Sequence, residues 1–188
     1  MIDVEPLLSD AGPEMLRRLK LLGYRYFGIF LSDNDGIQKD AIELGLRVIY
    51  WQQRKSAKGI EGFTASAQVA ASRFTFLKIP LNFRFQETRA YVRRYQSKLD
   101  ALALSFKEIR EMFKQNDASR IADTIGRLRA LLLSTNTGLL VYSEAASPEE
   151  LVSPVSYEYL LSLILNRNEP MNMLRMKKTY DSLLQVSI

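Results

Sequence analysis

Apolar residues gather in short runs along the chain, and each run has the length of a β-strand. Runs of this kind, bounded by glycine, proline or polar turn residues, are typical of strands buried in a sheet. The clearest is Leu139-Leu140-Val141-Tyr142, which follows a glycine and contains no charged residue. We predict strands at residues 2–5, 26–31, 46–51, 74–79, 100–105 and 138–142.

Between these runs, apolar residues recur at intervals of three and four, which is the spacing of an amphipathic helix. Phe85, Val92 and Leu99 share such a face in a predicted helix at residues 84–99. Other helices are predicted after Pro13, at residues 37–44 and 121–132, and from about residue 148, where Ser147-Pro148 has the form of a helix start.

Strands that alternate with helices predict parallel strands joined by helical crossovers. The fold class is therefore α/β, either a TIM-barrel-like closed sheet with outer helices or an open α/β sheet. A complete eight-stranded barrel typically takes about 250 residues. With 188 residues and fewer predicted strands than a complete barrel, we expect an irregular or trimmed barrel that forms a single domain over residues 1–188.

Composition narrows the range of functions. The chain is 47% hydrophobic and 25% charged, which suits one packed domain, and it contains neither cysteine nor histidine. Disulfide frameworks, zinc sites, thiol nucleophiles and serine–histidine triads are thereby excluded. Because no apolar run approaches the roughly 18 residues of a membrane helix and no signal-like segment opens the chain, we expect a cytoplasmic protein with no membrane partner.

Positive charge is concentrated in the middle of the chain. Residues 47–129 hold 17 basic and 7 acidic side chains, whereas both flanking segments are net acidic. Such an asymmetry suits the neutralisation of nucleic-acid phosphates, and arginine, the commoner cation here, can also stack on unpaired bases. The candidate RNA-binding residues are Arg54, Lys55, Lys58, Arg73, Lys78, Arg84, Arg89, Arg93, Arg94 and Lys98, with the stretch at 54–58 expected to be a mobile basic loop.

Two enzymatic alternatives and one scaffolding alternative remain open at this stage. Asp3, Glu5, Asp33 and Asp35 could meet at the carboxyl-terminal rim of a barrel and bind a divalent cation. Lys78, between two apolar residues of a predicted strand, could form a Schiff base with a carbonyl substrate. The basic helix could instead bind an acidic protein. No dinucleotide or Walker phosphate loop is present.

Several stretches resemble the PHP-like TIM-barrel protein subunit of archaeal and eukaryotic ribonuclease P. The clearest is the run 139–147, a late strand that ends in serine and small residues, followed by Glu150-Leu151-Val152-Ser153-Pro154 and an apolar helix to Leu165. The strand at 102–106 precedes a helix containing Arg127, as in the family, and residues 1–31 resemble its opening βαβ unit around Leu22-Gly23-Tyr24.

This resemblance implies a non-catalytic RNA-binding protein. In the family, the RNA subunit and its Mg²⁺ remove the 5′ leader from precursor tRNA, and the protein supports the shape of that RNA. The implied partners are ribonuclease P RNA, precursor tRNA, a small RRM-like protein subunit and the other ribonuclease P proteins. No catalytic residue, metal ligand or resident cofactor is expected in this chain, and Mg²⁺ is expected with the RNA subunit.

Overall fold

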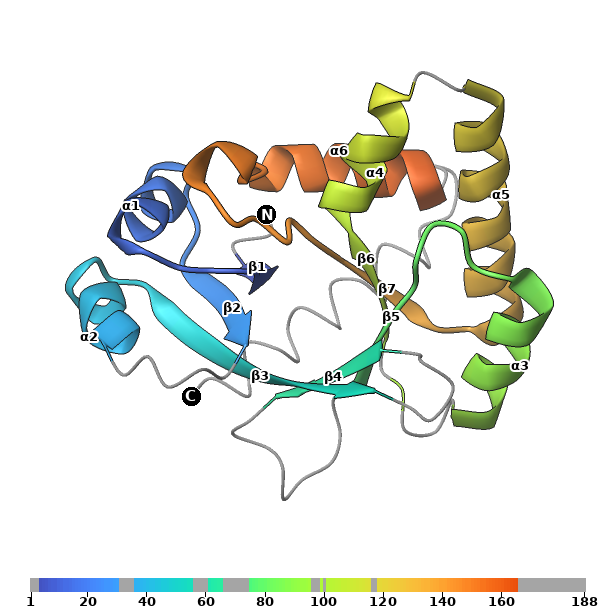
Figure 1. The fold of residues 1–188 in the computed structure, drawn as a ribbon, viewed down its shortest axis with the longest axis horizontal. Coiled ribbons are helices and arrows are strands. Elements are labelled where there is room, and N and C mark those ends of the chain that lie inside the picture. The colour runs from blue at the N-terminus through green and yellow to red at the C-terminus, as the bar shows by residue number, and fades with distance from the viewer. Residues whose placement is uncertain are drawn as a thin grey trace.

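The computed structural model describes residues 4–30, 36–55, 61–65, 75–95, 99, 101–115 and 118–165. Within them, short strands alternate with helices for most of the chain (Figure 1). The elements are β1 (Val4–Leu8), α1 (Pro13–Leu21), β2 (Tyr26–Phe30), α2 (Gly36–Glu43), β3 (Arg47–Lys55), β4 (Glu61–Ala65), β5 (Thr75–Lys78), α3 (Phe85–Tyr95), β6 (Ala101–Ser105), α4 (Phe106–Lys114), α5 (Ala118–Thr135), β7 (Gly138–Tyr142), the 3₁₀ helix η3 (Pro148–Glu150) and α6 (Pro154–Leu165).

The described strands form a seven-stranded sheet in the order in which they occur along the chain. β1, β2 and β3 are parallel, and so are β5, β6 and β7, while β4 joins these two groups by pairing antiparallel with both β3 and β5. Helices α1 and α2 lie beside the first group, and α3 and α5 lie beside the second (Figure 1). The prediction of a mixed α/β fold with parallel strands and helices is thus confirmed.

The two outer strands approach each other without forming a ladder. The backbone N–H of Glu144 donates to the carbonyl of Leu7 at 3.3 Å, and the N–H of Ser9 donates to the carbonyl of Ala145 at 3.0 Å. No strand pairing between β1 and β7 exists among the described residues, so the sheet is not a closed barrel. The TIM-barrel form of the prediction is therefore not confirmed.

The predictions for the first strand and for the basic loop need correction, and one strand was not predicted. The first strand was expected at residues 2–5 but continues to Leu8; Pro6 is tolerated because β1 is an edge strand that pairs only with β2. The basic loop expected at 54–58 is wrong at its start, since Arg54 and Lys55 end β3 and pair with Gly62 and Glu61 of β4. β4 was not expected because ladders on both sides stabilise a strand that has little apolar character of its own.

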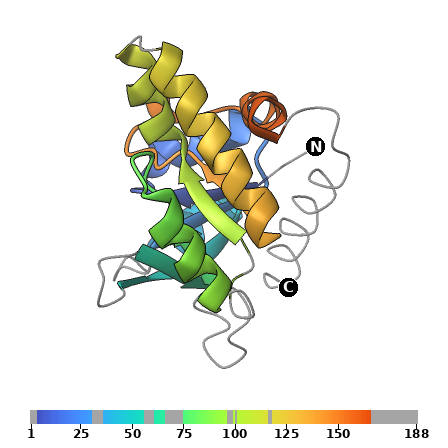
Figure 2. The same ribbon diagram turned by 90° about the vertical axis from the view of Figure 1, so that its right-hand side faces the viewer.

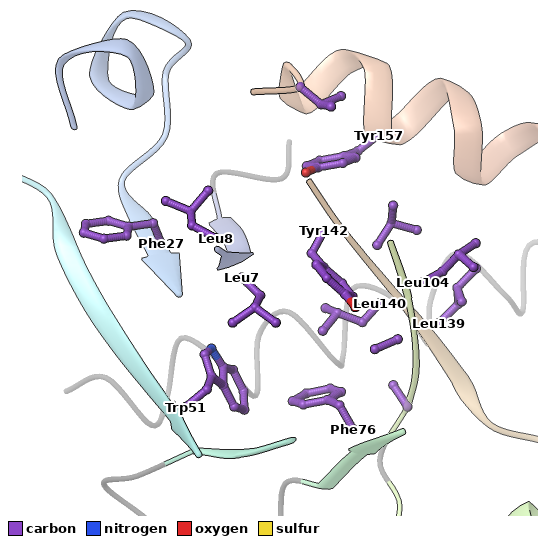
Figure 3. Packing of buried hydrophobic residues seen from close by; sticks show 14 of the residues in the cluster. Leu7, Leu8, Phe27, Trp51, Phe76, Leu104, Leu139, Leu140, Tyr142 and Tyr157 are labelled. Carbon is purple, nitrogen blue, oxygen red and sulfur yellow. The ribbon is translucent and has the colours of Figure 1, made fainter. Parts of the chain in front are cut away.

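The core lies on the inner side of this curved sheet (Figure 3). Trp51 from β3 and Phe76 from β5 are almost fully buried and meet edge to face, with ring centroids 5.1 Å apart. β4 separates these two strands in the sheet, so their contact shows that the sheet curls around its core. Other buried side chains extend the cluster to both faces of the sheet, from β1, β2, β6, β7 and α6: Leu7, Leu8, Phe27, Leu104, Leu139, Leu140, Tyr142 and Tyr157.

Helices cover the outer side of the second parallel group. Every residue of β6 is buried, as expected for a central strand covered on both faces. α3 and α5 pack side by side on the outside of the molecule (Figure 2). No helix in the described part of the chain combines the length and the apolarity that crossing a membrane requires.

Candidate functional site

Helices α3 and α5 pack against each other and bring a group of arginines together. We call the segments 84–95 and 118–135 the basic helix pair. They carry seven arginines, at positions 84, 89, 93, 94, 120, 127 and 129, and only two carboxylates, Glu87 and Asp123. Segment 148–165, by contrast, carries three glutamates and no lysine or arginine. Other exposed basic residues, among them Arg17 and Arg18 of α1, lie elsewhere on the fold.

The arginines of α3 are mostly accessible. Arg84 pairs with Glu87 at 3.2 Å, but both side chains are highly exposed, so the pair adds little stability. Arg93 and Arg94 are exposed at the carboxyl end of the helix, where Arg93 donates to the Ser134 carbonyl at 3.3 Å. Arg89 is half-buried, and its Nε has no hydrogen-bond partner among the described residues. None of these four arginines is held in a buried ion pair with a described residue.

Arg127 of α5 is held by contacts with Asp123 and Phe83. Its Nε lies 2.9 Å from a carboxylate oxygen of Asp123, one turn earlier on the helix. Its guanidinium donates to the Phe83 carbonyl at 3.4 Å and lies 5.7 Å from the centre of the Phe83 ring. Arg127 therefore links α5 to the segment that leads into α3.

Only part of the predicted RNA-binding set falls in this cluster. Arg84, Arg89, Arg93 and Arg94 do, whereas Lys58, Arg73 and Lys98 lie outside the described residues. Arg54 and Lys55 are placed in β3 by their backbone alone.

Three arginines of α5 were missed as candidates. Arg120 and Arg127 are seven residues apart, which is two helical turns, and this spacing predicts a shared face. What the spacing could not reveal is that this helix packs against α3. Arg129 lies on the same helix and is half-buried.

A second charged region lies where β5, β6 and β7 end. A cleft of about 680 Å³ opens there, between the strand ends and helices α4 and α5. We call it the strand-end cleft. Its lining residues are Lys78, Pro80, Leu81, Asn82, Lys107, Glu108, Glu111, Met112, Gln115, Arg120, Thr124, Arg127 and Glu144.

Lys78 is the most buried charge of this cleft. Its Nζ lies 2.8 Å from Glu144 and 3.6 Å from Glu108, and its side chain is 16% exposed. Glu108 also accepts a hydrogen bond from the backbone of Leu81. Two neighbouring carboxylates stabilise the ammonium form of Lys78, whereas Schiff-base formation needs the neutral amine. The geometry therefore gives no support to the Schiff-base alternative.

The outer part of the cleft is also charged. A hydrogen bond from Lys114 lowers the pKa of Glu111, so this carboxylate stays ionised to lower pH than an isolated glutamate. Arg120 donates to Gln115 at 3.0 Å, which connects the start of α5 to the end of α4. Both carboxylates and cations thus line the cleft.

Of the acidic rim considered as a metal site, only the backbone of Glu5 lies among the described residues. Glu5 lies in the middle of β1 and pairs with Phe27 of β2, well before the end of the strand. Asp3, Asp33 and Asp35 lie outside the described residues. Within the described ranges, no group of three or more histidine, cysteine, aspartate or glutamate side chains could hold a metal ion.

Comparison with known proteins gave no relative. No family model, no curated protein and no solved structure matches this chain. Function is therefore inferred from the basic helix pair, from the strand-end cleft and from the sequence stretches that surround them.

Proposed function

We propose that this chain is an RNA-binding protein subunit of ribonuclease P and that the basic helix pair contacts phosphates of the catalytic RNA. The observation that carries the proposal is the gathering of seven arginines on two packed helices with only two carboxylates among them. Planar guanidinium groups bind phosphate through paired hydrogen bonds. Exposed arginines such as Arg93 and Arg94 release counterions when they bind RNA.

The segments that resemble the ribonuclease P family support this assignment by their place in the fold. The run 139–147 comprises most of β7 and the turn that leads to η3, and Glu150–Pro154 precedes and opens α6. The stretch at 102–106 comprises most of β6, which pairs with β7, and the first residue of α4. Two separate stretches that resemble the family are therefore on neighbouring strands of the sheet.

We further propose that the sheet is an irregular, barrel-like relative of the TIM barrel found in this family. The backbone hydrogen bonds between the ends of β1 and β7 favour this interpretation. So does the contact of Trp51 with Phe76 across the inside of the sheet. The antiparallel β4 is the main departure from eight-fold βα symmetry.

In this proposal the protein performs no bond breaking. The RNA subunit, with its Mg²⁺, cleaves the 5′ leader from precursor tRNA, while the basic helix pair offsets repulsion between crowded phosphates. The proposed partners are ribonuclease P RNA, precursor tRNA, a small RRM-like subunit and the other ribonuclease P proteins, and the proposed location is the cytoplasm. Each single charge removal on the exposed helix surface should weaken RNA binding by about 1 kcal/mol or less, so losses should accumulate.

A reconstituted particle tests the proposal. Cleavage of precursor tRNA is measured across a range of Mg²⁺ concentrations, with the complete set of proteins and with only this chain omitted. We expect the incomplete particle to need more Mg²⁺ because uncompensated phosphates must then be neutralised by free cations. Equal activity at every Mg²⁺ concentration would refute the proposal.

A further inference from the structure

We propose that the strand-end cleft binds a single unpaired nucleotide of RNA whose base carries an exocyclic amino group. The inference rests on the proposed function, because it takes the nucleotide from an RNA already held by the basic helix pair. It goes further by naming a pocket, the class of ligand and the chemistry that selects it.

The size and lining of the cleft suit a nucleotide. Its volume of about 680 Å³ falls within the range typical of small-molecule sites. Pro80, Leu81 and Met112 supply apolar surface against which the faces of a base can pack. Asn82 and Gln115 supply amide groups beside that surface.

Cations of the same cleft are placed to hold the phosphate. Lys107, Arg120 and Arg127 line it, and the last two also belong to the basic helix pair. The ion pair with Asp123 and the contacts with Phe83 hold the Arg127 guanidinium in place before any ligand arrives. A backbone that follows the basic helix pair therefore meets Arg120 and Arg127 where it reaches the cleft.

Glu144 supplies the group that would select the base. One of its oxygens accepts a hydrogen bond from Lys78 at 2.8 Å, and its other oxygen, Oε2, has no partner among the described residues. A carboxylate oxygen without a partner can accept a hydrogen bond from the exocyclic amino group of guanine, cytosine or adenine. Uracil has no exocyclic amino group, and its ring N3–H lies between two carbonyl oxygens, which a carboxylate repels.

The backbone at Glu144 supports a functional role for this residue. Its φ angle is +55°, a left-handed conformation that side-chain-bearing residues seldom adopt. Hydrogen bonds fix it there, from the Glu144 N–H to the Leu7 carbonyl and from the Ser9 hydroxyl to the Glu144 carbonyl. Strained residues that neighbouring elements hold in place are concentrated at binding sites.

Calorimetric titration of the full chain with mononucleotides tests the proposal directly. Guanosine and cytidine 5′-monophosphates should bind about tenfold more tightly than uridine 5′-monophosphate, because their exocyclic amino groups donate to the carboxylate without bringing two carbonyl oxygens beside it. Glu144→Gln should abolish this difference, and Arg120→Ala should weaken all the nucleotides. Arg17→Ala, which removes an exposed charge on α1, is the matched control and should change neither. Methyl resonances of Met112 report whether the ligand occupies the cleft.

Binding of trinucleotides then distinguishes a nucleotide within an RNA chain from a free mononucleotide. A trinucleotide with guanosine in the middle should bind at least as tightly as the mononucleotide. Binding of mononucleotides but not of trinucleotides would overturn the assignment to RNA. Equal affinity for the uridine nucleotide, or an unchanged Met112 methyl resonance, would overturn the assignment of the strand-end cleft as the binding site. If Glu144→Gln fails to fold, Arg120→Ala with unmodified Glu144 still tests the cleft. A particle that needs this chain for activity while the chain binds no nucleotide would refute the cleft proposal and leave the proposed function standing.

Discussion

The salt dependence of RNA binding gives the sharpest test of the basic helix pair. Arg93 and Arg94 are exposed neighbours at the carboxyl end of α3, and their replacement by alanine removes two charges without opening the core. The matched control is Arg17→Ala with Arg18→Ala, which removes two exposed charges from α1. Both double variants have the same net charge, so a difference between them reports the location of the charges.

The size of the effect follows from counterion release. Each lost phosphate contact makes the slope of log K against log salt shallower by about 0.7 for single strands and 0.9 for double strands. Over a fourfold rise in salt, from about 50 to 200 mM, two contacts correspond to a change in affinity of about 7-fold to 12-fold. The wild-type chain should therefore lose about 7-fold to 12-fold more affinity than the α3 variant over this interval.

Fluorescence anisotropy with labelled ribonuclease P RNA measures this difference. The α3 variant should bind more weakly at low salt and approach the wild type at high salt, whereas the α1 variant should follow the wild type throughout. Equal loss of slope in both variants would show that only net charge matters. An unchanged slope in the α3 variant would show that Arg93 and Arg94 touch no phosphate, and either result would refute the reasoning.

Three further predictions concern stability, and urea or thermal unfolding of the full chain checks each of them. Tyr24→Phe should destabilise the fold by about 1–3 kcal/mol, because the buried Tyr24 hydroxyl donates to the Val152 carbonyl and its loss leaves that carbonyl without this donor. Ser105→Ala should destabilise by about 1 kcal/mol, because the Ser105 hydroxyl caps the first turn of α4; no loss would show that the cap is unimportant. Gly45→Ala should destabilise the fold by about 1–2 kcal/mol, because the φ angle there is +69°. Gly126→Ala should stabilise it by about 0.5–1 kcal/mol, because an added methyl group at this helical position of α5 meets open space. A change of the same sign at both positions would contradict this pair of predictions.

Strands that are buried on both faces could be predicted well from the sequence. β7 has the predicted bounds, residues 138–142, and β6 differs from its prediction by one residue. Continuous apolar runs are typical of such strands, because both of their faces pack against other parts of the core. β4 had no such signal, since its stability comes from the ladders with β3 and β5.

For the candidate site, the arginines of α3 could be predicted from the sequence, but the tertiary contacts that complete the site could not. Runs of arginine in segment 84–94 are visible in the sequence, and the structure places them on or just before one helix. The packing of α5 against α3 is a tertiary contact with no local signature. The same holds for Lys78 and Glu144, which are 66 positions apart yet form an ion pair.

The meeting of β1 with the end of β7 has a practical consequence for handling the protein. Leu7 and Ser9 hold the backbone of Glu144 and Ala145 through three hydrogen bonds, so the first strand braces a turn that is more than 130 positions away in the chain. Trimming the chain to start after Ser9 would therefore loosen one wall of the strand-end cleft while leaving α4 and α5 in place. An affinity tag for nucleotide-binding work is better attached to the other terminus.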